Sequence, residues 1–348
     1  MSEASLFKKS LLNANDGRPP VWFMRQAGRY HSHYQGLKKS HSFVDLCKVP
    51  ALALETTMGP IRDFDFDAAI LFSDLLFPLE AMGMGLSYDP APKLSWHIKT
   101  VGDLENLRGG LELLPQLTFQ GKAMELIRKA LPADKGLLGF VGGPLTLFFY
   151  AVEGSHQGKL ESAVEGLKDG RFQGFCEKLL DLLAANMALQ ARAGADTIAV
   201  LDTCAGEIDA DSFRKIVVPQ LRGLLDRFKK LCPDVPVTYY SKGTGDAQWS
   251  TLGDLPIDVI GIDWKHYLPT VIRKWHTRFG IQGNFDPELM LLPARQLESK
   301  IRDFLQSVKE LPRDMRFGWI CGLGHGVLQK TPEENVRLFL RLQKEIYG

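Results

Sequence analysis

Residues 20–30 read Pro-Val-Trp-Phe-Met-Arg-Gln-Ala-Gly-Arg-Tyr, an apolar run that ends abruptly in two arginines. Arg25 and Arg29 are four positions apart, so a helical turn would place both guanidinium groups on one face, where like charges repel. The pair is easier to explain if an anion binds between them, because guanidinium groups bind carboxylates and phosphates through paired hydrogen bonds. The alternative is a pair of surface arginines neutralised by nearby Asp or Glu.

The same pattern, a short apolar run followed by glycine or polar residues, recurs along the chain. Each run predicts a short strand, and most of the stretches between runs have helical periodicity. Strands that are buried on both faces and alternate with helices indicate a parallel sheet covered by helices. The expected strands are Val21–Met24, Ala68–Phe72, Leu137–Val141, Thr197–Leu201, Val237–Tyr240, Val259–Ile262, Phe279–Gln282 and Arg316–Ile320.

Repeated strand–helix units predict an α/β protein whose fold is a single-domain (β/α)8 TIM barrel over residues 1–348, with residues 1–18 as an N-terminal extension. An open doubly wound sheet is the alternative, but no Gly-x-Gly-x-x-Gly fingerprint follows the first run and no P-loop occurs in the sequence. Thr331 and Glu334 predict a capping box that opens the last helix. The helices with the clearest periodicity are expected over 172–193, 211–231, 297–311 and 332–347.

The composition narrows the class of protein. The chain has 42 basic and 41 acidic residues and no basic block, which argues against a nucleic-acid or membrane-surface partner. No secretory signal begins the sequence and no apolar run is long enough to span a bilayer, so a soluble cytoplasmic protein is expected. The 5 cysteines are scattered without a Cys-x-x-Cys pair, which fits reduced thiols better than disulfides or structural zinc.

Polar residues that follow the runs would converge at the carboxyl ends of the barrel strands, where such barrels build their active sites. Asp74 follows the second run, and a partly desolvated carboxylate there could accept N–H hydrogen bonds or stabilise a developing cation. Its alternative role is a helix cap. His325 lies in Gly322-Leu-Gly-His-Gly326, where glycines allow the backbone to approach a ligand and histidine suits proton transfer or carboxylate binding. Tyr150 and Thr203 are candidate hydroxyl donors.

The sequence gives no reason to expect a metal. His31 and His33 form too small a cluster for a metal site, and no His-Glu-x-x-His or comparable spacing occurs. Cys204 and Cys321 flank the candidate region and are interpreted as packing residues, because neither has an obvious activating partner. Basic residues near an acidic residue, without a metal or nucleotide motif, predict a site for an anionic organic molecule that needs no cofactor.

Residues 20–30 closely resemble the signature of the uroporphyrinogen decarboxylase family, and the resemblance continues in the family's order and spacing over essentially the whole chain. It implies a single-domain (β/α)8 barrel, usually a homodimer with facing active sites. It also implies conversion of uroporphyrinogen III to coproporphyrinogen III in haem biosynthesis, by loss of four acetate carboxyls as carbon dioxide without a metal or organic cofactor. The other matching segments are Phe72-Ser73-Asp74, Gly142-Gly143-Pro144, Tyr150–Gly154, Leu201-Asp202-Thr203, Gln282–Pro287 and Leu323–Gly326.

The resemblance implies residue roles as well. Asp74 would hydrogen-bond the pyrrole N–H groups and stabilise the cation that forms when a pyrrole carbon is protonated, a contact that can be worth about 3 kcal/mol. An arginine, with a pKa above about 12, is a poor donor of that proton, so the donor stays open. The substrate-binding residues implied by position are Arg25, Gln26, Ala27, Gly28, Arg29, Asp74, Tyr150, Thr203 and His325, and those also implied to be catalytic are Asp74, Arg25, Arg29, Tyr150 and His325.

Three departures from the family pattern concern the shape of the pocket and the preference between substrate isomers. Leu145 stands where tryptophan is common, Gly322 stands where asparagine is common, and Ser87–Lys99 is less typical than its surroundings. Two other functions are alternatives. A methyltransferase of the same barrel superfamily would use zinc with His and Cys ligands and lack the Arg-Gln-Ala-Gly-Arg loop. A tetrapyrrole-binding protein without catalysis is the second, and the joint presence of the candidate catalytic residues argues against it.

Overall fold

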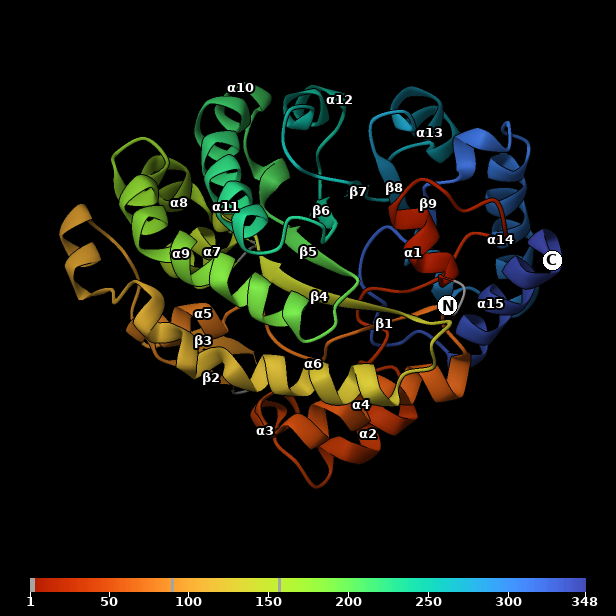
Figure 1. The fold of residues 1–348 in the computed structure, drawn as a ribbon, viewed down its shortest axis with the longest axis horizontal. Coiled ribbons are helices and arrows are strands. Elements are labelled where there is room, and N and C mark those ends of the chain that lie inside the picture. The colour runs from red at the N-terminus through yellow and green to blue at the C-terminus, as the bar shows by residue number, and fades with distance from the viewer. Residues whose placement is uncertain (1–3, 89–90, 156–157) are drawn as a thin grey trace.

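Seven parallel strands form a curled sheet surrounded by helices (Figure 1). The computed structural model describes residues 4–88, 91–155 and 158–348. The sheet order is β1-β4-β5-β6-β7-β8-β9, so neighbours in the barrel follow one another in the chain and helices connect them. The strands are β1 Ala68–Ile70, β4 Gly136–Gly142, β5 Thr197–Asp202, β6 Val237–Ser241, β7 Val259–Gly261, β8 Gly280–Phe285 and β9 Trp319–Leu323.

The first expected strand, Val21–Met24, is reduced to a single parallel bridge between Val21 and Cys321 of β9. The Cys321 N–H donates to the Pro20 carbonyl at 2.9 Å, and on the other side the Asp67 N–H donates to the Val21 carbonyl at 2.9 Å. Asp67 directly precedes β1, so this short segment joins the first strand of the sheet to the last. The predicted α/β barrel is confirmed, although its first strand is shorter than expected.

The Asp67 carboxylate fixes this junction, which we call the seam. It accepts hydrogen bonds from the Val21 N–H, at 2.8 Å, and from both terminal nitrogens of Arg18, at 2.5 and 2.7 Å. Asp67 is almost fully buried, so the paired geometry of the guanidinium compensates the cost of burying the charge. Two residues of the N-terminal segment are thereby tied to the start of β1.

The outer helices agree with the expected periodicity except at one position. The predicted helices over 172–193, 297–311 and 332–347 correspond to α9, α14 and α15, whereas the stretch 211–231 is interrupted. There α11 is preceded by a π-helical turn, Phe213–Val217, because Pro219 lacks an N–H and cannot continue a regular α-helix through the preceding turn.

The longer helices are α2 Ser32–Lys38, α4 Pro50–Phe64, α6 Thr118–Ala130, α7 Pro144–Glu153, α9 Arg171–Arg192, α11 Val218–Leu231, α13 Leu268–Trp275, α14 Ala294–Lys309 and α15 Glu333–Tyr347. Shorter helices are α1 Leu6–Leu11, α3 Phe43–Lys48, α5 Phe77–Leu79, α8 Glu161–Gly166, α10 Ala210–Ser212 and α12 Asp246–Trp249.

Two predictions near the C-terminus are wrong in detail. The expected strand Arg316–Ile320 begins later, at Trp319, because residues 314–316 form a 3-10 turn. The expected capping box is not formed, because Pro332 adopts the N-cap conformation and α15 begins at Glu333. Thr331 therefore lies outside the helix, and its buried hydroxyl has no hydrogen-bond partner in the described part of the chain.

The N-terminal extension expected over residues 1–18 packs against the barrel in its described part. Helix α1, capped by Ser5, buries Phe7 and Leu11 and contacts the first residues of β4 and the region of β9. The Phe7 ring lies against Gly136 at the start of β4, where a β-carbon would collide with it. Helix α1 therefore lies at the amino-terminal end of β4 and beside β9, away from the carboxyl ends that form the site (Figure 1).

A two-stranded antiparallel hairpin that the periodicity did not predict lies between β1 and β4. It consists of β2 Leu86–Tyr88 and β3 Pro92–Leu94, with Tyr88 opposite Pro92. The hairpin falls in the stretch Ser87–Lys99 that is less typical of the family. Its strands are too short to give an alternating pattern, so no sequence signal marked them.

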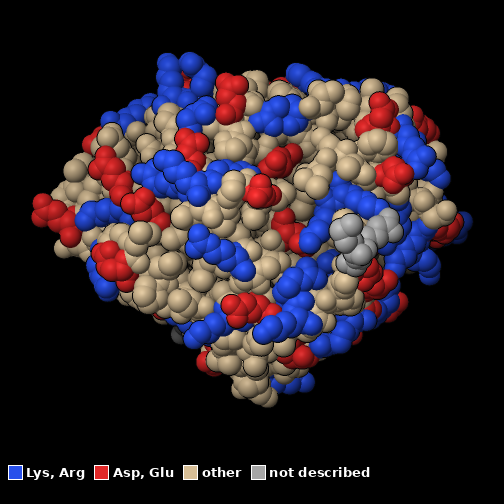
Figure 2. All heavy atoms as spheres, in the orientation of Figure 1, with Lys and Arg blue, Asp and Glu red and all other residues tan. Residues whose placement is uncertain are grey.

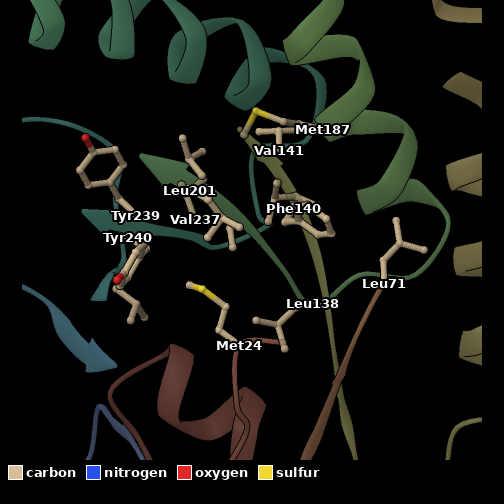
Figure 3. Packing of buried hydrophobic residues seen from close by; sticks show 14 of the residues in the cluster. Met24, Leu71, Leu138, Phe140, Val141, Met187, Leu201, Val237, Tyr239 and Tyr240 are labelled. Atoms are coloured by element: carbon tan, nitrogen blue, oxygen red, sulfur yellow. The ribbon is translucent and has the colours of Figure 1, made fainter. Parts of the chain in front are cut away.

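The core contains side chains from the barrel strands and the helices around them, and Figure 3 shows Phe140, Leu201 and Tyr240 from three successive strands. Met24, just beyond the seam, belongs to the same buried cluster. On the face drawn in Figure 2, basic and acidic side chains are intermixed, in line with the formal net charge of +1. All five cysteines are buried and free, as predicted. In the described residues, no helix has the length and apolar character that crossing a membrane requires.

Candidate active site

A cavity of about 510 Å³ lies at the carboxyl ends of the strands. It brings together residues from Met24 to Gln329, as expected for loops that follow different strands of one barrel. Eight of the nine predicted binding residues line it. These are Arg25, Ala27, Gly28, Arg29, Asp74, Tyr150, Thr203 and His325.

The loop that carries the two arginines is a series of turns, so the helical arrangement considered from their spacing does not occur. Arg25 has a left-handed backbone conformation, with φ of 62°. This brings its carbonyl so close to Gly28 that a β-carbon there would lie 2.9 Å away, which only glycine avoids. Both arginine side chains are exposed and line the cavity from the same side.

Gln26, the ninth predicted binding residue, is buried beneath this loop and is not among the residues that line the cavity. Its amide nitrogen donates to the Ala68 carbonyl of β1 at 3.1 Å, and its amide oxygen accepts the Phe23 N–H at 3.2 Å. The Tyr30 hydroxyl donates to its backbone carbonyl at 2.8 Å. Gln26 thus connects the arginine loop to the first strand of the sheet.

Asp74 follows β1 and lines the cavity from a half-buried position. One of its oxygens accepts the Leu76 N–H at 2.8 Å. Burial raises the pKa of its carboxyl, while the Leu76 N–H, the Tyr88 hydroxyl and the positive charge of Arg25 act in the opposite direction. The carboxylate is therefore supported by local donors and by one arginine, although burial disfavours its charge.

A buried carboxylate behind the site orients the element that carries Tyr150. Asp202, the last residue of β5, accepts the Thr146 backbone N–H at 3.0 Å and the Thr146 hydroxyl at 2.7 Å. The Tyr239 hydroxyl also donates to Asp202, at 3.0 Å. Thr146 lies in the first turn of α7, so Asp202 satisfies an N–H at the start of the helix. Tyr150 follows one turn later, and Thr203 is the next residue after Asp202.

His325 is held by Tyr240 of β6. The two rings stack with centroids 5.9 Å apart, and the Tyr240 hydroxyl lies 3.0 Å from His325 Nδ1. That hydroxyl donates its single hydrogen to the Gly324 carbonyl at 2.9 Å, so its oxygen must accept from Nδ1–H of the imidazole. The neutral histidine is therefore the Nδ1–H tautomer, and Nε2 is its basic nitrogen.

The glycines around His325 make room for other parts of the chain. A β-carbon on Gly326 would lie 2.5 Å from Cδ of Arg25, so this glycine lets the arginine side chain pass. A β-carbon on Gly322 would lie 2.5 Å from the Trp22 carbonyl, across the seam. The sequence suggested that these glycines approach a ligand, whereas these two approach the arginine loop. Neither Gly322 nor the buried Leu145 lines the cavity.

Some residues of the cavity wall could not be recognised from the sequence. With its amide oriented to match its surroundings, Gln329 accepts from Arg29 Nη2 at 2.6 Å and Nη1 at 3.1 Å. Phe43 and Pro92 line the wall on the side of Asp74. These residues carry no motif, and only the folded chain brings them to the site. In the described ranges, no group of three His, Cys, Asp or Glu side chains is arranged to hold a metal ion.

Comparison with known proteins gives a consistent assignment. The family model described as "Uroporphyrinogen decarboxylase (URO-D)" matches residues 3–346. The chain is 33% identical over 334 residues to the uroporphyrinogen decarboxylase of Solibacter usitatus, covering 94% of this chain and 93% of that protein. It is 34% identical over 331 residues to that of Syntrophotalea carbinolica, covering 93% and 94%.

A solved structure supports the fold independently of these sequence matches. A methyltransferase from Methanosarcina mazei superposes with a TM-score of 0.77 over 99% of this chain and 100% of that one, at 19% sequence identity. At that identity the likeness concerns the fold alone. The match of the family model over nearly the whole chain, together with the relatives, shows that this chain belongs to the uroporphyrinogen decarboxylase family.

Proposed function

We propose that this chain removes the four acetate carboxyls of uroporphyrinogen III as carbon dioxide and forms coproporphyrinogen III in porphyrin and haem biosynthesis. The observation that carries the proposal is a cavity in which a half-buried carboxylate, Asp74, shares the wall with two exposed arginines, Arg25 and Arg29. The chemistry we propose uses side chains of this protein, without a metal or an organic cofactor. Membership of the family and the names of the relatives support the same reaction.

The arginines suit a substrate that carries many carboxylates. Arg25 and Arg29 are exposed and long, so each can follow a flexible acetate or propionate group and bind it through two parallel hydrogen bonds. Ala27 and Gly28 form the backbone between them, and Gln26 holds that backbone on β1. We infer that this loop binds carboxylates and orients the tetrapyrrole over the cavity.

Asp74 suits the step in which charge develops. Protonation of a pyrrole carbon makes the ring an electron sink, so that the C–C bond to the acetate carboxyl can break and its electron pair can move into the ring. The carbon dioxide leaves, a second proton completes the methyl group, and the proton first added to the ring carbon is then lost, which restores the pyrrole. A carboxylate in a desolvated wall can accept the pyrrole N–H groups and stabilise the cation, by about 3 kcal/mol for one such contact.

Three further side chains complete the proposed site. Burial, together with the charge of Asp74, raises the pKa of Tyr150, so its phenol stays protonated and can donate to a substrate carboxylate. Thr203 offers a second hydroxyl at the same wall. His325, whose Nδ1–H is engaged by Tyr240, can use Nε2 to bind a carboxylate or to move a proton.

An anaerobic assay with purified protein and enzymatically generated uroporphyrinogen III tests the proposal. Products are separated by their number of carboxyl groups, with and without a chelator. Stepwise loss of carboxyls to the four-carboxyl product, unchanged by the chelator, is the expected result. Tight binding of uroporphyrinogen without release of carbon dioxide would overturn the proposal and favour a non-catalytic tetrapyrrole-binding protein.

We also propose that the protein is a homodimer in the cytoplasm, as the family resemblance implies. Its five free and buried cysteines are in keeping with a reducing compartment. Analytical ultracentrifugation would give the oligomeric state, and a single species with the mass of one chain at micromolar concentration would contradict the dimer.

A further inference from the structure

The hairpin between β1 and β4 brings a tyrosine to the wall of the cavity. Tyr88, the last residue of β2, pairs with Pro92 of β3, and Pro92 lines the cavity. The Tyr88 ring packs against Phe43 with centroids 4.7 Å apart, and Phe43 lines the cavity as well. The short antiparallel pair and the aromatic contact therefore fix the tyrosine beside the site.

The Tyr88 hydroxyl is buried, and it has no hydrogen bond of ordinary geometry to any residue that the structure describes. The group it faces is the Asp74 carboxyl, with which it interacts directly. A buried hydroxyl is normally paired, since leaving it unpaired is unfavourable. In a hydrogen bond between them, the phenol would be the donor and the carboxylate the acceptor.

We propose that Tyr88 is a positioning residue for Asp74: its hydroxyl holds the carboxylate as an anion, oriented toward the cavity. The inference rests on the proposed function only for its catalytic consequence, since the contact itself involves two residues of this chain. Nothing in the family resemblance assigns a role to this position. It lies in the stretch Ser87–Lys99, which is less typical of the family than its surroundings.

The charged and titratable groups around the pair are consistent with this role. Arg25, Tyr150 and Cys47 face Asp74, and Cys47 and Glu80 also face Tyr88. Burial raises the pKa of Cys47, so the thiol stays protonated. Burial and the charge of Asp74 also raise the pKa of Tyr88, which keeps the phenol protonated and able to donate.

The variant Tyr88→Phe tests the proposal, because it removes the hydroxyl and keeps the ring that packs on Phe43. We expect the acid limb of the pH profile of kcat/KM to move up by about one pH unit, the size of one lost hydrogen bond to a charged group. We expect KM to change less than threefold. The control is Tyr347→Phe, which removes a hydroxyl that donates to the Leu305 carbonyl outside the cavity. An acid limb that stays in place in Tyr88→Phe, or moves equally in the control, would overturn the role.

A second measurement needs no activity. Carbon-13 NMR of protein labelled at the aspartate carboxyl carbons follows the titration of Asp74, assigned by its absence in Asp74→Asn. In Tyr88→Phe we expect Asp74 to titrate about one pH unit higher than in the unchanged protein. An unchanged titration disproves the contact. A shifted titration in a protein that fails to decarboxylate uroporphyrinogen would refute the proposed function and leave the contact standing.

Discussion

The two walls of the cavity are built in opposite ways. The arginine wall, Arg25 and Arg29 with Gln329, lies on exposed turns beyond the seam, where the first strand of the barrel is reduced to one bridge. The acid wall, Asp74 with Tyr88 and Tyr150, is half-buried, and burial raises the pKa of all three groups. The arginine wall is open to water, whereas the acid wall is partly withdrawn from it.

This difference assigns different tasks to the two walls. An exposed ion pair contributes little energy, because water screens it, but long side chains can adapt to several carboxylates in turn. A charge in a desolvated wall interacts strongly with a charge that develops beside it. We therefore expect the arginine wall to govern binding and the acid wall to govern turnover, and the following predictions test this division.

The largest effect is expected from Asp74→Asn, which keeps the shape of the side chain and removes its charge. We expect kcat to fall by roughly 100-fold to 1,000-fold, because the cationic intermediate loses its counter-charge. KM should stay within about threefold of that of the unchanged protein, since the arginine wall is intact. Steady-state kinetics under anaerobic conditions measure both. A large rise in KM at constant kcat would show that Asp74 acts on binding and not on turnover, which contradicts the division between the walls.

Arg29→Ala should act on binding. We expect KM to rise by about 10-fold, the size of one lost charge-assisted hydrogen bond to a carboxylate, with a smaller change in kcat. The matched control is Arg295→Ala, which removes an exposed arginine from the outer helix α14. Saturation curves that coincide for Arg29→Ala and the control would show that Arg29 does not bind substrate.

The response to pH distinguishes the walls, since only the acid wall titrates. Burial raises the pKa of Asp74, so the active carboxylate is lost as pH falls, and the acid limb of kcat/KM should lie above 3.8. Below the limb, kcat/KM should fall about tenfold per pH unit. Arg25→Gln removes the positive charge that lowers this pKa and should move the limb upward, whereas Arg29→Gln should move it less. If the acid limb lies at the same pH in both variants, the charge of Arg25 does not lower the pKa of Asp74 more than that of Arg29 does.

The smallest effect is expected from Gln329→Ala. Its amide oxygen restrains the Arg29 guanidinium on the exposed side of the cavity, so its loss should raise KM about threefold and leave kcat and the acid limb unchanged. Competition between uroporphyrinogen isomers I and III, measured in one reaction, would show whether this restraint also affects selectivity. A change of kcat greater than that of KM would show that Gln329 acts on turnover, the task expected of the acid wall, and not on binding.

Much of this arrangement could be predicted from the sequence because buried parallel strands leave a simple pattern. The runs over β4, β5 and β6 are mostly apolar and are followed by glycine or polar residues, so the ends of these strands, and with them Thr203, were located closely. Val21–Met24 has the same pattern for another reason. Phe23 packs on Phe66 and Phe339, each with centroids 5.1 Å away, and this packing gives an apolar run without a strand.

What could not be predicted depends on contacts between distant segments. Gln329 reaches Arg29 across 300 positions, and Tyr88 reaches Asp74 from a hairpin too short to leave a periodic signal. Gln26 belongs to the predicted binding loop, yet its buried amide supports the loop from beneath. A motif identifies which residues lie near a site, but it does not distinguish those that face the ligand from those that hold the loop.

The seam has a consequence for how the protein is made. Val21 needs Cys321 on β9 to close the barrel, and Gly326 makes room for Arg25. The arginine wall therefore joins a segment that precedes β1 in the chain to one that follows β9. A nascent chain that ends before β9 can form earlier strand pairs, but it cannot complete the site. The site can be completed only after β9 has been made, and a chain truncated before residue 319 should be inactive even where its helices have formed.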